Sequence, residues 1–375
     1  MSGVVARSWL AALVALAALG AVCEPGTIRV TNRPPDPVLV DADGALDRAG
    51  VEALIAAVER ERGRRFVQHP TLELLAPDDP RIPDRLAAAR ALEPCPRAGV
   101  AKWKPDAAGR CVVAASLEWI ECVAPPDLEE ARRALRRLFD AQEHPALARA
   151  APLLPGDPGV ALRALLAASA NGATAHDGAT ALDLLELDTI DVERQDVPGD
   201  ACVAIADHFL SAQSDPDAAF RRPPLSTKQL VSPQRYRAGE RPLLLLGPPP
   251  TIAGCSVAAD ESVGVARLLA ALVARGGSLR GTLLAAWQGD RGVRYACDDG
   301  HAPWLYAAEF ADAKRAAAFA SEVARLLPDD FAGPSVAEAL ARRVVVSSRD
   351  LDAPTARAWA SSLTTAELVG FRGVE

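Results

Sequence analysis

The sequence lacks the patterns that mark the commonest catalytic and phosphate-binding sites. It has no G-x-S-x-G motif of the kind that carries a nucleophilic serine, and no glycine-rich phosphate-binding loop. Its 7 cysteines include no C-x-x-C pair, which argues against a structural zinc site built from cysteine. No two of the 5 histidines have the spacing of a helical metal-binding pair. These histidines are His69, His144, His176, His208 and His301.

Excess positive charge is also missing. The formal net charge is -8 and the isoelectric point is near 5.3. Nucleic acids and anionic membranes bind through clustered cations, so neither is an expected partner. Aromatic residues make up only 5% of the chain, but hydrophobic residues make up 50% of its 375 residues. This composition suffices for a large core in one large or two moderate domains.

The apolar run near the N-terminus is too short to cross a membrane. Arg7 precedes apolar residues 9–19, and small residues follow, which is the layout of a secretory signal peptide with cleavage after Gly20. We therefore predict a signal peptide at residues 1–22 and export to the periplasm or the extracellular space. A lipid anchor on Cys23 is an alternative maturation, and no other membrane attachment is expected. Retention in the cytoplasm is the remaining alternative.

The six other cysteines predict disulfides formed in an oxidising compartment. We expect Cys255 to pair with Cys297. Cys95 is expected to pair with either Cys111 or Cys122, and the sequence leaves that choice open.

Changes in composition and periodicity divide the chain. Residues 23–45 are rich in proline and aspartate and are expected to be a linker, residues 46–275 a main domain, and residues 276–375 a C-terminal α/β subdomain. A polar turn near Gly109 is expected to close a hairpin ahead of Cys111. Helices are predicted at residues 51–63, 86–92, 203–210, 263–273, 313–327 and 354–363, and strands at 66–75, 243–246, 304–310 and 344–348.

Asp127 begins a predicted amphipathic helix, because its side chain can cap the helix and Glu130 follows three residues later. An apolar stripe is expected to be buried and an arginine-rich face to be solvated and paired with Glu129 and Glu130. The stripe consists of Leu128, Ala131, Leu135 and Leu138, and the face of Arg132, Arg133, Arg136 and Arg137.

Residues 223–236 read P-P-L-S-T-K-Q-L-V-S-P-Q-R-Y, and we name them the signature loop. The prolines hold the entry extended, Ser226 and Gln229 have the spacing of a capping box, and Pro233 ends the short helix. The stretch closely resembles P-P-x-S-T-E-Q-I-L-H-P-E-K-Y, the signature of a family of secreted bacterial proteins predicted to be zinc metallopeptidases of the H-E-x-x-H type. The matching residues include Pro224, Ser226, Thr227, Gln229, Pro233 and Tyr236.

A second segment, residues 283–295, resembles the family's A-A-x-G-W-x-G-D-R-Y-x-x-Y. We expect a turn at residues 288–292 between two strands, with Trp287 and Tyr295 packed across the hairpin. The resemblance implies an α+β, zincin-like, helix-rich fold. The tail is expected to form a small C-terminal β-β-β-α-β-α layer.

In the resembled family, the zinc-binding helix reads H-E-L-T-H-A-L-Q-D-Q, with two histidines on the metal and a glutamate activating water. Aligning Leu138 and Asp140 with its L-Q-D places Arg132, Arg133 and Arg136 at these three positions. A shift by one residue places Arg133, Ala134 and Arg137 there instead.

The third zinc ligand of the family is a glutamate in A-L-V-E-G-D-A-T, and Asn171 stands at that position. Arginine cannot coordinate a cation, because it stays protonated and has no free lone pair. We therefore expect no catalytic residue, no metal and no cofactor.

The leading expectation is an exported, catalytically inactive metallopeptidase-like protein that acts as a binding or structural module of the cell envelope, with an unidentified protein or peptide partner. One alternative is an active metal-dependent peptidase with a rebuilt zinc site that uses His144, His176 or His208 with nearby carboxylates. The other is a protein that binds anions or peptides through the face from Arg132 to Arg137.

Overall fold

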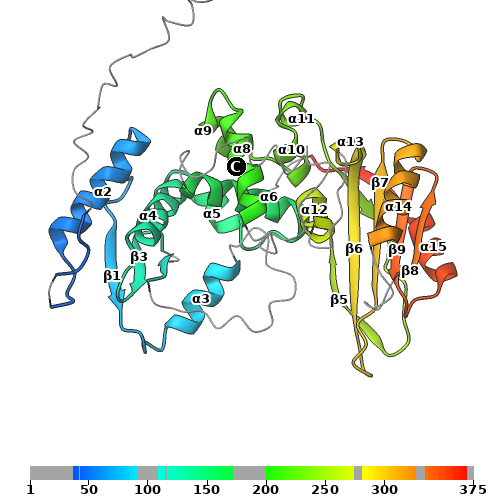
Figure 1. Ribbon diagram of the computed structural model, residues 1–375, viewed down its shortest axis with the longest axis horizontal. Coiled ribbons are helices and arrows are strands. Elements are labelled where there is room, and N and C mark those ends of the chain that lie inside the picture. The colour runs from blue at the N-terminus through cyan, green and yellow to red at the C-terminus, as the bar shows by residue number, and fades with distance from the viewer. Residues whose placement is uncertain are drawn as a thin grey trace, which may run out of the picture. The chain divides into compact units, whose positions relative to one another are not determined.

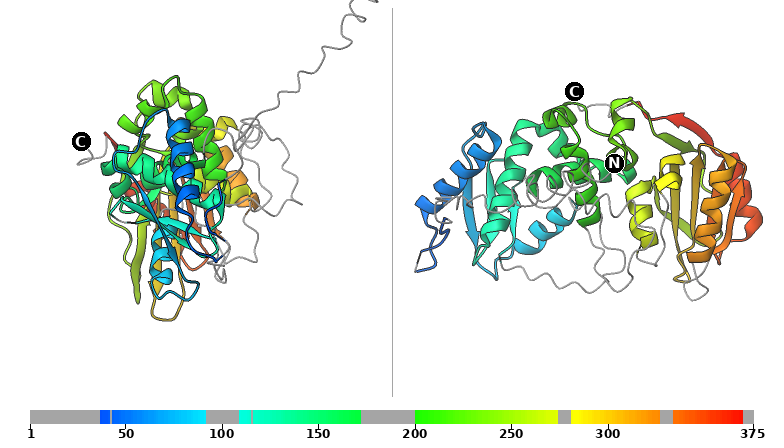
Figure 2. Two further views of the ribbon diagram at one scale, coloured as in Figure 1. Left: turned by 90° about the vertical axis from the view of Figure 1, so that its left-hand side faces the viewer. Right: turned by 45° about the horizontal axis from the view of Figure 1, so that its top comes forward.

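The protein is described by a computed structural model (Figures 1 and 2). The structure describes residues 37–41, 43–91, 109–114, 116–171, 200–273, 281–326 and 334–369. Residues 38–375 belong to one compact unit. The predicted signal peptide, Cys23, Cys95, His176 and the turn that leads to Gly109 lie outside the described residues.

A three-stranded sheet packs with the first helices of the chain. These elements are α2 (Arg48–Arg62), β1 (Thr71–Leu75), α3 (Ile82–Ala91), β2 (Cys111–Val113), β3 (Trp119–Val123) and α4 (Leu128–Glu143). β3 lies between a parallel β1 and an antiparallel β2, and apolar side chains of α2 and α4 join the sheet in one hydrophobic cluster. The prediction for α2 is confirmed: the Asp47 side chain caps it and Gly63 ends it in a left-handed conformation. Of the strand predicted at residues 66–75, only the second half forms a strand, β1.

The first disulfide differs from the expected pairing. Cys111 is bonded to Cys122, and neither is bonded to Cys95. The two residues lie directly opposite each other in the antiparallel β2–β3 pair, where side chains are within disulfide reach. β3 was not predicted, because the charged Glu121 interrupts its apolar run. The bond between Cys255 and Cys297 is confirmed. Disulfides of this kind indicate an oxidising compartment, as expected for an exported protein.

A group of helices surrounds α6, which is buried along most of its length. They are α5 (Pro145–Ala150), α6 (Gly156–Asn171), α8 (Asp200–Ser211), α9 (Pro216–Arg221), α10 (Thr227–Val231), α11 (Pro233–Arg237), α12 (Gly264–Val273) and α13 (Gly281–Ala286). α6 contacts α4, α8, α10 and α12. The predicted helices at 203–210 and 263–273 are confirmed as α8 and α12.

An antiparallel five-stranded sheet follows, in the order β5-β6-β7-β9-β8, with a two-stranded β10–β4 sheet beside it. Its elements are β4 (Leu243–Leu246), β5 (Cys255–Glu261), β6 (Trp287–Cys297), β7 (Trp304–Phe310), α14 (Ala313–Leu326), β8 (Pro334–Leu340), β9 (Arg343–Ser348), α15 (Ala353–Ser362) and β10 (Thr364–Glu367). Alternate residues of β7 and β9 point to opposite faces, and α14 and α15 cover one face each (Figures 1 and 2).

The expected β-β-β-α-β-α tail is wrong in two places. β8 and β10 were missed, and the tail from β6 onward runs β-β-α-β-β-α-β. The predicted turn at residues 288–292 is also wrong, because these residues lie inside the continuous strand β6 and pair with β7. A bulge between Trp287 and Gly289 changes the register, so Trp287 and Tyr295 pack in different hydrophobic clusters and not against each other.

The structure has an α+β architecture. In the part of the chain that it describes, no helix has the length and apolar character needed to span a membrane.

Candidate functional site

The arginine face of α4 is the first part of the candidate site. The helix begins as predicted, with the Asp127 carboxylate accepting a 2.9 Å hydrogen bond from the Glu130 amide. Ala131, Leu135 and Leu138 of the apolar stripe are buried, as expected, and Leu128 is half-buried. The expectation that the arginines are solvated is wrong for Arg132 and Arg136, each of which is only 8% exposed. Arg133 is half-buried and pairs with Glu130 at 3.0 Å.

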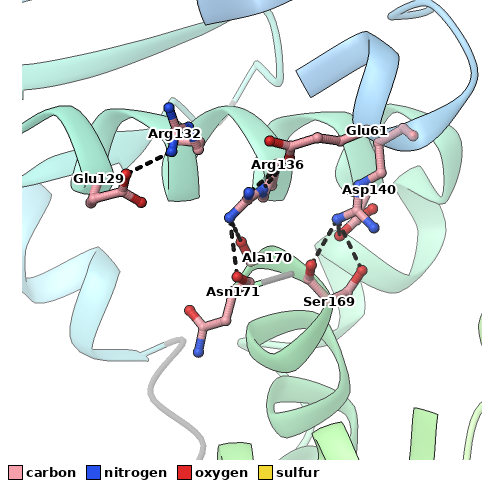
Figure 3. A network of polar contacts seen from close by, with 9 residues as sticks. Glu61, Glu129, Arg132, Arg136, Asp140, Ser169, Ala170 and Asn171 are labelled. Atoms are coloured by element: carbon pink, nitrogen blue, oxygen red, sulfur yellow. Dashed lines mark hydrogen bonds and ion pairs between the residues drawn. The ribbon is translucent and has the colours of Figure 1, made fainter. Parts of the chain in front are cut away.

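Arg136 joins three helices. Its Nε donates to Glu61 Oε2 of α2 at 2.8 Å, and a terminal nitrogen lies 2.7 Å from the same oxygen. The other terminal nitrogen donates to the backbone carbonyls of Asn171 at 3.0 Å and Ala170 at 3.4 Å (Figure 3). Those carbonyls lie at the C-terminal end of α6, which carries partial negative charge. The guanidinium therefore occupies the junction between α2, α4 and the end of α6.

Arg132 lies one turn before Arg136 and donates to Glu129 Oε1 at 2.6 Å (Figure 3). The family alignment places Arg132, Arg136 and Asn171 at the metal-ligand positions. Arg132 and Arg136 lie on α4 and Asn171 ends α6, and the two helices are in contact. Asn171 contacts Arg136 through its backbone oxygen and not through its side-chain amide.

The next turn of α4 adds a buried carboxylate. Asp140 is 6% exposed and accepts a 3.0 Å hydrogen bond from an Arg62 terminal nitrogen. The same nitrogen lies 2.8 Å from the Ser169 carbonyl oxygen and 3.1 Å from its hydroxyl (Figure 3). Burial raises the pKa of Asp140 to about 6, and the charge of Arg62 opposes this increase. Arg136 thus contacts the last turn of α6 directly, and Asp140 is connected to it through Arg62 of α2.

The donor set at this junction does not suit a metal. A cation placed among Arg132, Arg136 and Asn171 would meet two guanidinium groups, which repel it and offer no lone pair. Among the described residues, no three His, Cys, Asp or Glu side chains are grouped so that they could hold a metal ion.

Among the described residues, no histidine side chain contacts the junction between α2, α4 and α6. The ring of His144 stacks on Phe220, with centroids 4.9 Å apart, and burial lowers its pKa. His208 is half-buried on α8. His69 pairs with Glu52 at 3.1 Å on the surface.

The signature loop forms a capped helical turn, as predicted. The Ser226 hydroxyl accepts from the Gln229 amide at 3.4 Å, and Gln229 Oε1 accepts from the Leu225 amide at 2.6 Å. The first turn, α10, ends at Val231 with Ser232 as its C-cap, and α11 starts at Pro233. Thr227 is fully buried and Ser226 is 1% exposed, so the start of this turn lies in the interior of the protein.

Glu240 holds the signature loop in place, a role that no pattern in the sequence indicates. Its carboxylate contacts Lys228 Nζ at 2.6 Å and an Arg235 nitrogen at 2.5 Å, and its carbonyl accepts from Gln229 Nε2 at 2.6 Å. Lys228 is only 3% exposed, and burial lowers its pKa. The hydroxyl of Tyr236 donates to the Arg222 carbonyl at 2.7 Å.

Both segments that carry the family resemblance meet at a buried polar cluster. Thr227 of the loop donates through its amide (3.1 Å) and its hydroxyl (2.5 Å) to Asp157 Oδ1 at the start of α6. Asp290 of β6 accepts from the amides of Val263 and Gly264 at the start of α12. Asp157 was not among the candidate residues, because no sequence signal shows that this helix start is buried against the loop.

Comparison of the chain with protein-family models, curated proteins and solved structures found no match. The metallopeptidase resemblance therefore rests on the motifs quoted above.

Proposed function

We propose that this chain is an exported, catalytically inactive relative of the zinc metallopeptidases that it resembles, and that it acts as a binding or structural module of the cell envelope. The proposal takes zincin-like as the finer description of the α+β fold. It assigns no metal and no catalytic residue to the chain.

The observation that carries the proposal is the role of Arg136. Under the alignment of Leu138 and Asp140 with the family helix, Arg136 stands at the second histidine, and it binds the end of α6 beside the third ligand position, Asn171. A side chain that holds two helices together and pairs with Glu61 acts as a structural substitute for a metal that would hold the same elements.

The retained motifs support the same conclusion. Ser226, Thr227 and Gln229 bond to backbone groups and to Asp157, and none of these contacts needs a metal. A loop with such roles can keep its sequence after catalysis is lost, because its residues stabilise the fold.

Metal content and peptidase activity test the proposal. The protein is produced by secretion from a bacterial host, so that its disulfides form. It is then purified without added metal and analysed for zinc. We expect far less than one equivalent of zinc and no cleavage of unfolded protein substrates. One equivalent of zinc, lost together with cleavage in His176→Ala, would establish the rebuilt-site alternative instead. His69→Ala is the matched control, because His69 lies on the surface and pairs only with Glu52 among its described contacts.

An anion- or peptide-binding face on α4 is less well supported. The guanidinium groups of Arg132 and Arg136 are buried and already bonded to glutamates, so a ligand would have to displace Glu129 or Glu61. The more exposed Arg133 also has a glutamate partner. We therefore propose that an unidentified protein or peptide partner binds to another surface of the module.

Membrane association is proposed through Cys23 alone. If Cys23 is lipidated, the mature protein partitions with membranes and Cys23→Ser releases it; if the signal peptide is cleaved without lipidation, both forms stay in the aqueous fraction. Mass spectrometry of the mature N-terminus distinguishes the two.

A further inference from the structure

The cluster between α6, the signature loop and the five-stranded sheet contains two buried carboxyl groups. Asp157 is 2% exposed and Asp290 is 1% exposed. Both lie against Gly264, which has a φ of +79°. A Cβ on Gly264 would come within 1.8 Å of Asp157 Oδ1, and the Gly264 amide donates to Asp290 Oδ2 at 3.0 Å. One glycine residue therefore separates the two carboxyl groups.

The hydrogen bonds distinguish the two groups. Asp290 accepts from four donors, which use both of its oxygens, as an ionised carboxylate can. Oδ1 accepts from the Ser262 hydroxyl at 2.7 Å and the Val263 amide at 2.9 Å, and Oδ2 accepts from the Gly264 amide at 3.0 Å and the Tyr306 hydroxyl at 3.0 Å.

Asp157 has a different environment. Thr227 Oγ1 accepts from the Ala266 amide at 3.0 Å, so its hydroxyl hydrogen is available to Asp157 Oδ1, 2.5 Å away. The Thr227 amide donates to the same oxygen. Oδ1 thus acts as the accepting oxygen, which leaves Oδ2 as the place for a proton in the neutral acid.

We propose that Asp157 and Asp290 form a proton-dependent latch, in which Asp157 carries a proton, Asp290 carries the charge, and loss of the proton loosens the attachment of the signature loop to the five-stranded sheet. This latch is independent of whether the chain descends from a peptidase.

The charged groups around the latch do not neutralise a second negative charge by direct contact. Among the described ion pairs, neither carboxyl has an arginine or lysine partner. Arg267 of α12 pairs with Glu261 of β5 at 2.8 Å, and Tyr306 of β7 is held protonated, because burial and Asp290 raise its pKa. Burial raises the pKa of Asp157 to about 7, with a further increase from Asp290 and a decrease from the Thr227 hydrogen bonds.

The sign of the effect follows from the raised pKa. The stabilising contribution of protonated Asp157 is complete below its unfolded-state value of 3.8 and is lost as the pH rises through about 7. Burial raises the pKa of Asp290 as well, but its four donors favour the ionised form. Two like charges in one buried cluster then oppose the attachment of Thr227 and Gly264.

Thermal unfolding of the full disulfide-bonded chain between pH 5 and 8.5 tests the latch with Asp157→Asn, an isostere of the neutral acid. We expect the melting temperature of the variant to exceed that of the wild type by a margin that grows from pH 5 to about pH 7 and then stays constant, because both states of the wild type are ionised above that pH. A difference that stays constant over this range would overturn the proposal.

Two further measurements keep the test decisive. Asp290→Asn is expected to be less stable at every pH and to move the remaining titration of Asp157 to lower pH, because the like charge is gone. If Asp157→Asn does not fold, infrared spectra of Asp140→Asn report on the wild-type latch, since this variant removes a buried acid outside the latch whose pKa is also raised, to about 6. A carboxylic acid band that persists at pH 6 and disappears above pH 7 is the expected result, and its absence at pH 6 would contradict the proposal.

Discussion

Arg136 of α4 donates a 3.0 Å hydrogen bond to the backbone carbonyl of Asn171, the last residue of α6. The alignment with the zinc-binding segments of the resembled family places both residues at ligand positions. A positively charged side chain on the negative end of a helix dipole is stable without a metal. Under the proposed relationship to metallopeptidases, the contact provides a physical reason why α4 and the end of α6 stay together without a metal.

Removing this contact should destabilise the protein. Arg136→Ala leaves Glu61 and the α6 carbonyls without their donor, and we expect a loss of about 1.5–3 kcal/mol in the free energy of unfolding. Arg133→Ala, on the more exposed side of α4, should change it by only about 0.5 kcal/mol. Urea unfolding monitored by circular dichroism measures both values, and equal losses would show that Arg136 has no special role.

Introducing the zinc-binding residues of the resembled family should create a zinc site. We expect Arg132→His, Arg133→Glu and Arg136→His combined with Asn171→Glu to bind one zinc ion, because these side chains would project from the meeting point of α4 and α6. The same substitutions shifted by one residue on α4, at Arg133, Ala134 and Arg137, form the matched control. Zinc titration by calorimetry distinguishes them, and equal affinity in the two variants would contradict the alignment.

The hydrogen bond between Thr227 and Asp157 should support the signature loop. Thr227→Val keeps the shape of the side chain but removes the hydroxyl, and should cost about 1–3 kcal/mol, because Asp157 and the Ala266 amide both lose a partner. Thr227→Ser retains the hydroxyl and should cost less. If denaturation curves place the two variants at the same stability, the hydroxyl contributes nothing.

The disulfide between Cys255 and Cys297 should stabilise the protein more than the one between Cys111 and Cys122. The first closes a sequence separation of 42 residues and the second a separation of 11. On the chain-entropy estimate, the double serine variant at 255 and 297 loses about 1 kcal/mol more than that at 111 and 122. Thermal unfolding of the two double variants compares them directly, and the reverse order would contradict the estimate.

Acid should stabilise the fold within a defined window. Burial raises the pKa of Asp140 to about 6 and that of Asp157 to about 7, so these two groups bind more protons in the folded state than in the unfolded state between about pH 4 and 7. We expect the free energy of unfolding to fall as the pH rises through this window. Urea midpoints at intervals of half a pH unit measure the change. A midpoint that rises steadily from pH 4 to pH 7 would show that the ionised forms are favoured.

The sequence predicts local structure well where the signal is local. Asp127 as a cap and the apolar stripe of α4 were sufficient to place that helix, and Ser226 with Gln229 placed α10. Contacts between residues that are far apart in the chain could not be predicted from the sequence. The burial of Arg136 depends on Glu61 and on the end of α6, which lie 75 and 35 residues away in the chain.

Turn-forming residues also misled the prediction. Residues 288–292 contain two glycines and an aspartate, which favour a turn, but pairing with β7 holds them in a strand. β8 was missed because its alanines have low β-propensity, and its pairing with β9 supplies what the local sequence does not.

The central claim is that the chain keeps a metallopeptidase scaffold without its metal. The most direct test is the zinc content of the correctly disulfide-bonded protein, measured by elemental mass spectrometry after purification without chelators or added metal. We predict a zinc content far below one equivalent, unchanged in His176→Ala. One tightly bound zinc per chain that is lost in His176→Ala would contradict the account.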